Sequence, residues 1–454
     1  MRQIFTILAV IPSLVASRTT VASSPITSVA PIVATSPSQG AETITPERVN
    51  EMLGAKLFDP SGTTGLWNAP PRTVATLLNL PTESETSYES SFRSYTPGGE
   101  AKIVGCRVFS TILTGDHGKA VELSFMLANK GDIMAFLDGN DRSAYEVFCN
   151  VQRRTPTATV FSTPGMIRRY EAEIRKDNSL LEASLTKLFG TFKGGSFGRG
   201  ASTTERGKRW DWNGTTFFLA APSGEYVVLR LIPTATFDDN QSDRKGFEKA
   251  KEEIPDRIQR KQNGDVLLEV PQVDQGPKGY CVPATFARVM RYYGLHADMD
   301  LMAKAGNTTA GGGTFLASEN AGIFNLLGEA GLHVSPNSCR ISMRDIKTHI
   351  DRGEPIILGI NLSKEYLARI SSRNAGRENV TDWGDWSRGL TTYRAKAPQL
   401  AGGTLAHSCL IVGYNLTTGE IALSDSWSKE THPLWALVEE VGAAAQGAAT
   451  VISF

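Results

Sequence analysis

The sequence has no excess of either charge and contains little cysteine. Its 47 Lys and Arg residues balance 47 Asp and Glu residues, which argues against a nucleic acid or an anionic membrane as the main partner. The chain has five Cys and six His residues. Because His333 and His349 have no Cys, His or Asp neighbours at the spacing of metal ligands, we expect no metal site.

Long apolar stretches are also scarce. The run Ile4–Val15 near the N-terminus follows Arg2, is interrupted by Pro12 and is too short to cross a bilayer. Small residues follow it, so we interpret residues 1–23 as a secretory signal peptide and expect a secreted or periplasmic protein. A disordered apolar N-terminus is the alternative. No Cys follows the run, which argues against a lipoprotein anchor, and no other stretch predicts a membrane span in the mature chain.

The composition then changes along the chain in a way that predicts domains. Residues 24–44 are rich in Ser, Thr, Pro and Ala and are typical of a disordered spacer. Residues 45–236 have the pattern of a separate α+β domain of unknown role. Residues 237–264 are strongly charged, and their Lys and Glu spacing predicts a solvated linker helix that is broken at Pro255. Residues 265–454 form the second predicted domain, so the fold class is α+β.

The first of these domains shows secondary structure but no group of catalytic residues. Alternating apolar residues predict strands at 102–113 and 119–127, and a second hairpin at 215–233. Met166–Phe189 has the period of a helix. Cys106 and Cys149 are either a disulfide or two buried thiols. We expect a module that binds substrate or a surface, with an inhibitory pro-region as the alternative.

The first candidate catalytic residues lie in Gln275–Gly294. We interpret this stretch as a loop that places Cys281 at the start of a helix. Pro283 is tolerated only in a first helical turn, and Gly294 suits the position just after a helix end. The apolar residues that follow the Cys recur at spacings of three and four: Val282, Phe286, Val289, Met290 and Tyr293. A helix N-terminus favours an anion, so we expect a depressed thiol pKa at Cys281. A buried structural Cys is the alternative.

A second stretch, Leu405–Trp427, predicts two strands joined by a short turn at Gly419. His407 lies on the first strand and Asp425 at the end of the second. On adjacent strands the carboxylate can orient the imidazole. Together with Cys281 these residues have the pattern of acyl transfer by a thiol.

Three motifs in the C-terminal part resemble papain-like cysteine peptidases. Gln275-x5-Cys281 resembles their pair of oxyanion Gln and nucleophile, and HSCLIVGYN at 407–415 resembles their H-A-V-x-x-V-G-Y strand. Asp425–Trp427 resembles their N-S-W with Asp in place of Asn. That Asp, the short domain and the VMRYYG ending of the Cys helix are more similar to the C39-like branch, which is related to bacteriocin-processing peptidases. The resemblance covers roughly residues 270–454.

The resemblance implies a papain-like domain, with the Cys on a helix N-terminus and the His and Asp on an antiparallel sheet. It implies a peptidase of peptide or protein substrates in which Cys281 is the nucleophile, His407 the base, Asp425 its orienting carboxylate and Gln275 an oxyanion donor. The chain departs from papains at Val282, where they carry Trp, so we expect different packing around the base. Another cysteine acyl-transfer enzyme, such as a transglutaminase or a cell-wall amidase, and a non-catalytic binding module are the alternatives. The sequence does not specify an oligomeric state.

The remaining candidates have simpler interpretations. Gly311–Gly313 does not follow a predicted strand and lacks the Lys of a phosphate loop, so we expect a loop near the cleft and no nucleotide or other cofactor. His432 lies in a loop and lacks the strand placement of His407. Cys409 shares the face of His407 and is interpreted as a packing thiol.

Overall fold

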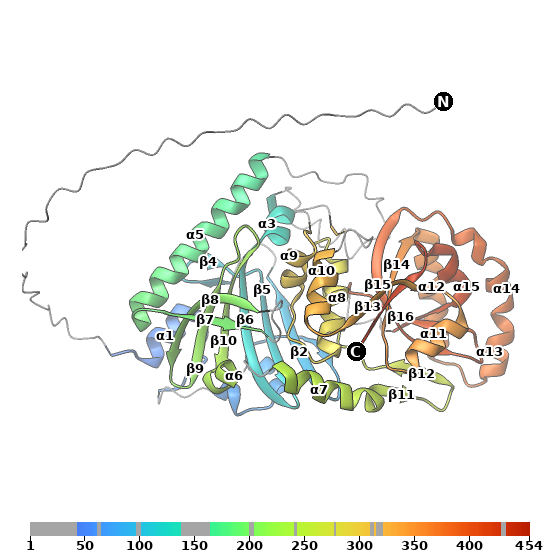
Figure 1. Cartoon of the computed structure of the whole chain (residues 1–454), viewed down its shortest axis with the longest axis horizontal. Coiled ribbons are helices and arrows are strands. Elements are labelled where there is room, and N and C mark those ends of the chain that lie inside the picture. The colour runs from blue at the N-terminus through green and yellow to red at the C-terminus, as the bar shows by residue number, and fades with distance from the viewer. Residues whose placement is uncertain are drawn as a thin grey trace, which may run out of the picture. The chain divides into compact units, whose positions relative to one another are not determined.

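The computed structural model describes residues 43–60, 65–96, 101–137, 164–198, 204–239, 243–276, 278–308, 313–314, 321–427 and 433–454. The predicted signal peptide at 1–23 and nearly all of the predicted spacer at 24–44 lie outside these ranges. Residues Ile44–Phe454 form one compact unit (Figure 1). Whether the chain divides at 236 and 265 as predicted stays a prediction, and the two sheets are therefore described in turn.

An eight-stranded antiparallel sheet spans the first part of the described residues, in the order β1-β2-β5-β6-β10-β9-β8-β7. Its strands are β1 (Thr82–Glu85), β2 (Glu89–Tyr95), β5 (Ser110–Asp116), β6 (Lys119–Asn129), β7 (Lys193–Phe197), β8 (Glu205–Trp212), β9 (Thr215–Ala220) and β10 (Tyr226–Pro233). The predicted hairpin at 215–233 is confirmed by the pairing of β9 with β10.

The strand predicted at 102–113 is wrong in its first half. Val104 and Gly105 have φ angles of 52° and 79°, so the backbone turns back on itself there. The result is a small hairpin of β3 (Lys102–Ile103) and β4 (Cys106–Arg107), and β5 begins only at Ser110. Alternation of apolar residues continues through the turn, which is why the pattern did not reveal it.

Helices cover one face of this sheet. Helix α5 (Pro164–Phe189) confirms the helix predicted at 166–189 and runs across the strands (Figure 1). Residues at alternate positions of β10 divide between two apolar clusters: Val227, Leu229 and Leu231 pack with α5, whereas Val228 and Ile232 pack on the other face with Phe237. The other helices here are α1 (Pro46–Leu53), η1 (Gly65–Trp67), α2 (Pro71–Leu77) and α3 (Lys130–Leu137).

The charged segment at 237–264 contains the predicted helix, and also a short 3-10 helix and a strand. Elements α6 (Thr234–Asp239), α7 (Asp243–Glu253), η2 (Ile254–Arg257) and β11 (Ile258–Arg260) follow one another, and the helix ends before Pro255 as expected. Arg257 is buried, with its guanidinium carbon 3.5 Å from the ring centroid of Tyr88. Strand β11 pairs with β12 of the second sheet. The segment is therefore only partly solvated.

The second sheet of the described residues is also eight-stranded and antiparallel. Six strands follow the order β11-β12-β15-β14-β18-β13, while β16 pairs with β15 and β17 pairs with β16. The strands are β12 (Asp265–Leu268), β13 (His333–Cys339), β14 (Ile356–Leu362), β15 (Leu405–Asn415), β16 (Glu420–Ser424), β17 (Leu434–Leu437) and β18 (Ala449–Ser453). The β15–β16 hairpin confirms the pair of strands predicted at 405–427, with Gly419 at φ 68° in the turn.

Helix α8 (Cys281–Tyr292) lies at the centre of the second core. All its residues except Cys281 and Arg291 are buried, so burial includes the predicted apolar stripe and extends beyond that face. Thr285 Oγ1 donates to the carbonyl of Ser408 on β15 at 3.3 Å. The remaining helices are α9 (Met299–Ala305), α10 (Ala321–Glu329), α11 (Met343–Ile350), α12 (Lys364–Arg377), α13 (Trp383–Gly389), α14 (Thr391–Ala395), η3 (Ala397–Leu400) and α15 (Val438–Ala444).

Among the described residues, no helix combines the length and the apolar character needed to cross a membrane.

Candidate functional site

Cys281 is the first residue of α8, as predicted, and its side chain is partly exposed. Burial raises the pKa of its thiol above the ordinary value of 9.0, against the opposing effect of the backbone N–H groups of Ser408, Val282 and Cys281 itself. The expected depressed pKa is therefore wrong for this arrangement. Removal from water destabilises the thiolate more than the helix N-terminus and these N–H groups stabilise it.

His407 lies on β15 and is 5% exposed. Burial lowers the pKa of its imidazole to about 4, while the carboxylate of Asp425 raises it and Arg288 lowers it further. Its Nε2 is buried and has no hydrogen-bond partner among the described residues. The imidazole is therefore neutral near pH 7.

The indole of Trp427 stacks on this imidazole, with ring centroids 3.9 Å apart. The register explains the contact. Leu410 of β15 pairs with Ser424, the last residue of β16. Because the strands are antiparallel, the residue three positions before Leu410, His407, lies opposite the residue three positions after Ser424, Trp427. The backbone N–H of Trp427 donates to Oδ1 of Asp425 at 2.8 Å. The predicted base thus has an aromatic cover, although Val282 stands where papains carry Trp.

The structure brings the predicted nucleophile, base and carboxylate to the same end of β15. The backbone N–H that faces the thiol of Cys281 belongs to Ser408, the residue after His407. The carboxylate of Asp425 is near enough for its charge to raise the pKa of His407. The three residues come from α8, β15 and the end of β16.

Gln275 is held next to these residues. Its side chain is almost fully buried, and both ends of the amide have partners: Nε2 donates to the carbonyl of Lys278 at 2.7 Å, and Oε1 accepts from Oγ of Ser426 at 2.7 Å. Its backbone N–H donates to the carbonyl of Ser426 at 2.9 Å. An amide nitrogen carries two hydrogens, and within the part of the chain that the structure describes only one of those on Nε2 has an acceptor, which leaves the second for a ligand.

Arg288 is a member of this site that the sequence reasoning missed. It lies on α8 two turns after Cys281 and is fully buried. Its guanidinium donates to the carbonyls of Pro271 and Ser424 at 2.9 Å and to that of Asp425 at 3.1 Å. Burial lowers its pKa to about 10. An Arg within an otherwise apolar helix face is the sequence signal that would have identified it.

Two other Cys residues that the structure describes, Cys409 and Cys106, are buried and have raised thiol pKa values. Cys409 is buried on β15, and burial raises its pKa well above the ordinary range, as expected of a packing thiol. Cys106 is buried with its Sγ 3.8 Å from the carbonyl of Asp177. Cys149 and His432 lie outside the described residues, so the disulfide alternative stays open. Within the described residues, no group of three or more His, Cys, Asp or Glu residues could hold a metal ion.

The glycine-rich loop lies partly outside the described residues. Its described member, Gly313, has its Cα 3.6 Å from the Cβ that a side chain at Gly279 would have. Gly279 is two residues before Cys281. This part of the loop is therefore near the start of α8, while its position near a cleft stays a prediction.

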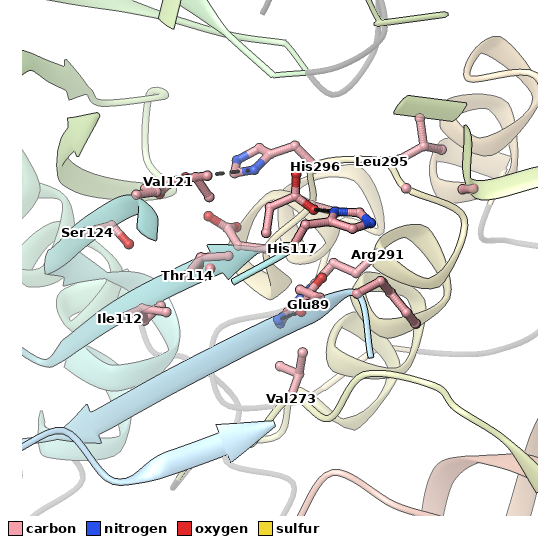
Figure 2. A pocket seen from close by; sticks show the side chains of 18 of the residues that line it. Glu89, Ile112, Thr114, His117, Val121, Ser124, Val273, Arg291, Leu295 and His296 are labelled. Carbon is pink, nitrogen blue, oxygen red and sulfur yellow. Dashed lines mark hydrogen bonds and ion pairs between the residues drawn. The ribbon is translucent and has the colours of Figure 1, made fainter. Parts of the chain in front are cut away.

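A separate cavity of about 310 Å³ lies between strands of the first sheet and the segment after α8 (Figure 2). Its charged side chains pair with one another: Arg291 binds Glu89, and His117 lies 2.8 Å from Asp116 and 3.2 Å from Glu253. None of the four predicted site residues lines this cavity. It is therefore distinct from the site at Cys281.

Comparison with protein families gives one finding that bears on this site. Residues 267–441 match the model of the Peptidase_C39 like family, which confirms the resemblance to the C39-like branch. The matched residues include α8, β15 and β16. Comparison with curated proteins gives no match. The protein thus combines helices and antiparallel sheets with a C39-like domain in the C-terminal part.

Proposed function

We propose that the protein is a secreted or periplasmic, thiol-dependent peptidase that cleaves peptide bonds in peptide or protein substrates. The observation that carries the proposal is the approach of the Cys281 thiol to the β15 backbone directly after His407. The C39-like match supports a cysteine peptidase fold. The interpretation of residues 1–23 as a signal peptide supports the location.

The first step uses neutral groups. Because the thiol pKa is raised and the imidazole pKa is lowered, the resting pair is a thiol and a neutral imidazole. When the sulfur of Cys281 bonds to the carbonyl carbon, its proton passes to His407. The resulting imidazolium is stabilised by the carboxylate of Asp425. This differs from the thiolate–imidazolium ion pair that the helix position alone suggests.

The oxyanion that forms needs donors. The free hydrogen on Nε2 of Gln275 and the backbone N–H of Cys281 fill this role, and each such donor typically contributes about 3–4 kcal/mol. As the intermediate collapses, the carbon–nitrogen bond breaks and the imidazolium of His407 gives its proton to the leaving amine. Water, deprotonated by the same imidazole, then hydrolyses the thioester and frees Cys281.

A non-catalytic binding module is the second candidate, because burial of an uncharged Cys281 and His407 also suits a site that no longer reacts. A transglutaminase or an amidase has the same three groups in the same chain order. A transglutaminase passes the acyl group to an acceptor amine in place of water, whereas an amidase uses water to cleave a cell-wall peptide. Assays with an added acceptor amine and with a cell-wall peptide as substrate therefore distinguish these enzymes from a peptidase.

The test is digestion of a mixed peptide library by the mature chain, with new termini identified by mass spectrometry. We expect cleavage by the wild type and a loss of at least about a thousandfold in Cys281→Ala. Cys339→Ala, which removes a buried thiol elsewhere, is the matched control and should retain the wild-type rate. Equal cleavage by wild type and Cys281→Ala would overturn the proposal, and no cleavage by either would favour the binding module.

A further inference from the structure

We propose that the first sheet positions the oxyanion donor of the second domain, through side chains of β1, β2 and α3 that hold the residues around Gln275. The segment concerned, called here the donor loop, comprises residues 272–276 and 278–280 and leads into Cys281. The inference rests on the proposed function and adds positioning residues to it. It makes the N-terminal half part of the working enzyme.

The first anchor of the donor loop is an ion pair. Nζ of Lys278 donates to Oδ2 of Asp132 on α3 at 2.7 Å, and both side chains are buried. Asp132 is itself fixed, because its backbone N–H donates to Oδ1 of Asn129 at 2.8 Å. A buried ammonium without a partner is strongly disfavoured, so Lys278 is confined to this position.

The confined residue is also the one that orients the donor. The carbonyl of Lys278 accepts both from Nε2 of Gln275 at 2.7 Å and from the backbone N–H of Tyr280 at 2.8 Å. The side chain of Lys278 thus fixes the loop to α3, while its carbonyl sets the direction of the Gln275 amide. Asp132 therefore acts on the oxyanion donor through Lys278.

A second anchor holds the residue before Gln275. Oε1 of Glu83 on β1 accepts from the backbone N–H of Asp274 at 2.9 Å, and the hydroxyl of Tyr95 on β2 donates to the carbonyl of Asp274 at 2.6 Å. Glu83 is buried and pairs with Arg93 at 2.5 Å. Both backbone groups of Asp274 are thus bound by the first sheet.

A third contact leaves no space between the donor loop and β2. Gly276 has a φ of +67°, and a Cβ at this position would lie 2.7 Å from the Tyr95 ring. At the other end of the loop, a Cβ on Gly131 of α3 would lie 2.8 Å from the ring of Tyr280. Strand β2 and helix α3 therefore contact the loop at two positions between Gln275 and Cys281.

A fourth contact joins the loop to the opposite side of the site. The backbone N–H of Gln272 donates to Oγ of Ser84 on β1 at 2.9 Å. The side-chain amide of the same residue donates to the carbonyl of Asp425. Gln272 therefore links the first sheet to the segment that carries the orienting carboxylate.

Not all contacts between the two halves reach the donor loop, and this provides a control. Glu89 of β2 binds Arg291, which lies at the far end of α8 from Cys281. If the first sheet only stabilised the protein, removing this ion pair and removing the Asp132–Lys278 pair would have similar effects. If it positions Gln275, only the second change affects reactions that form an oxyanion.

The experiment compares two reactions of Cys281 in the mature chain. Acylation by p-nitrophenyl acetate forms an oxyanion, whereas alkylation by iodoacetamide does not. In Asp132→Asn and Lys278→Met we expect acylation to fall by about tenfold or more, with alkylation unchanged within about twofold. The double variant Asp132→Asn/Lys278→Met removes both charges of the pair, although Asp300, whose Oδ1 lies 3.9 Å from Nζ of Lys278, loses its cation; it should recover part of the lost stability but not acylation. In Glu89→Gln both rates should remain as in the wild type.

Two further measurements decide how the effect arises. In a Gln275→Ala background, Asp132→Asn should cause no additional loss of acylation, because the two residues act through one donor. Hydrogen exchange of the backbone amides of Gln275 and Tyr280 should be faster in the Lys278→Met variant than in Glu89→Gln. Unchanged acylation, or an equal and additive loss in the Gln275→Ala background, would overturn the positioning role.

The exchange measurement also separates this inference from the proposed function. A wild-type chain that iodoacetamide alkylates at Cys281 but p-nitrophenyl acetate does not acylate counts against the peptidase. In that case faster exchange in Lys278→Met still supports the anchoring of the donor loop by α3, and unchanged exchange overturns it.

Discussion

The rings of His407 and Trp427 lie 3.9 Å apart, with their planes inclined by 29°. This stack excludes water from one face of the imidazole, and burial lowers the pKa of His407 to about 4. The two residues are brought together by a β-hairpin. The carboxylate of Asp425 accepts a hydrogen bond from the backbone N–H of Trp427, and its negative charge raises the pKa of His407. The aromatic ring that covers His407 and the carboxylate that acts on its pKa therefore both come from residues 425–427.

Removing the indole should raise the pKa of His407. In Trp427→Ala the imidazole regains water, and because desolvation is the main cause of its low pKa, the value should move from about 4 toward the ordinary 6.5. An NMR titration of the His407 ring measures this change. Trp427→Phe keeps an aromatic cover and should leave the pKa low. An unchanged value in Trp427→Ala would mean that the stack does not control solvation of the base.

Alkylation of Cys281 should depend on pH as expected of a thiol whose pKa is raised. Burial raises its pKa above 9.0, so the thiolate fraction increases only at alkaline pH. The rate of labelling by iodoacetamide should therefore still be rising at pH 9, rather than reaching a plateau near neutrality. Mass spectrometry of the Cys281 peptide gives the rate, with Cys281→Ala as the background. A plateau below pH 7 would instead indicate a thiolate–imidazolium pair.

Replacing Arg288 should destabilise the protein and disturb the site together. Arg288→Met removes the donors to the carbonyls of Pro271, Ser424 and Asp425. Each buried acceptor left without a donor lowers the free energy of unfolding by about 1–3 kcal/mol. We expect a loss of about 2–4 kcal/mol in the free energy of unfolding, measured in urea. The exposed Arg352 supplies a control, because Arg352→Met should change stability by less than about 0.5 kcal/mol.

Gly276 and Gly224 form a matched pair for testing the contact with Tyr95. Their φ angles are +67° and +72°, but a Cβ at Gly276 meets the Tyr95 ring whereas a Cβ at Gly224 has nothing within 4 Å. Both Ala variants carry backbone strain of about 1 kcal/mol. Only Gly276→Ala should lose further stability and slow acylation of Cys281. Equal unfolding free energies for the two variants would show that Tyr95 gives way easily.

Local patterns were sufficient to predict the elements that carry the candidate site. The apolar stripe after Cys281 and the alternation around His407 each occupy a dozen residues or fewer, and α8 and the β15–β16 hairpin follow them. The spacing of Gln275 and Cys281 also lies within one loop. These features depend on neighbours in the sequence, so the sequence alone reveals them.

Properties set by distant residues could not be predicted in this way. The pKa of Cys281 depends on how deeply the folded chain buries it, and the helix position alone gave the wrong direction. The contact of Glu83 with Asp274 joins residues 191 positions apart, and that of Asp132 with Lys278 joins residues 146 apart. No motif connects such pairs, so these contacts became visible only in the structure.

Strand β18 sits between β14 and β13, although it is the last strand of the sequence. Ile356 and Ile357 of β14 pair with its residues Val451 and Thr450, and β14 in turn pairs with the strand that carries His407. During synthesis Cys281, His407 and Asp425 are therefore all made before the strand that links β14 to β13. The neighbour of the His407 strand gains its second pairing partner only once residues 449–453 have left the ribosome, so this part of the sheet closes after every candidate site residue has been made.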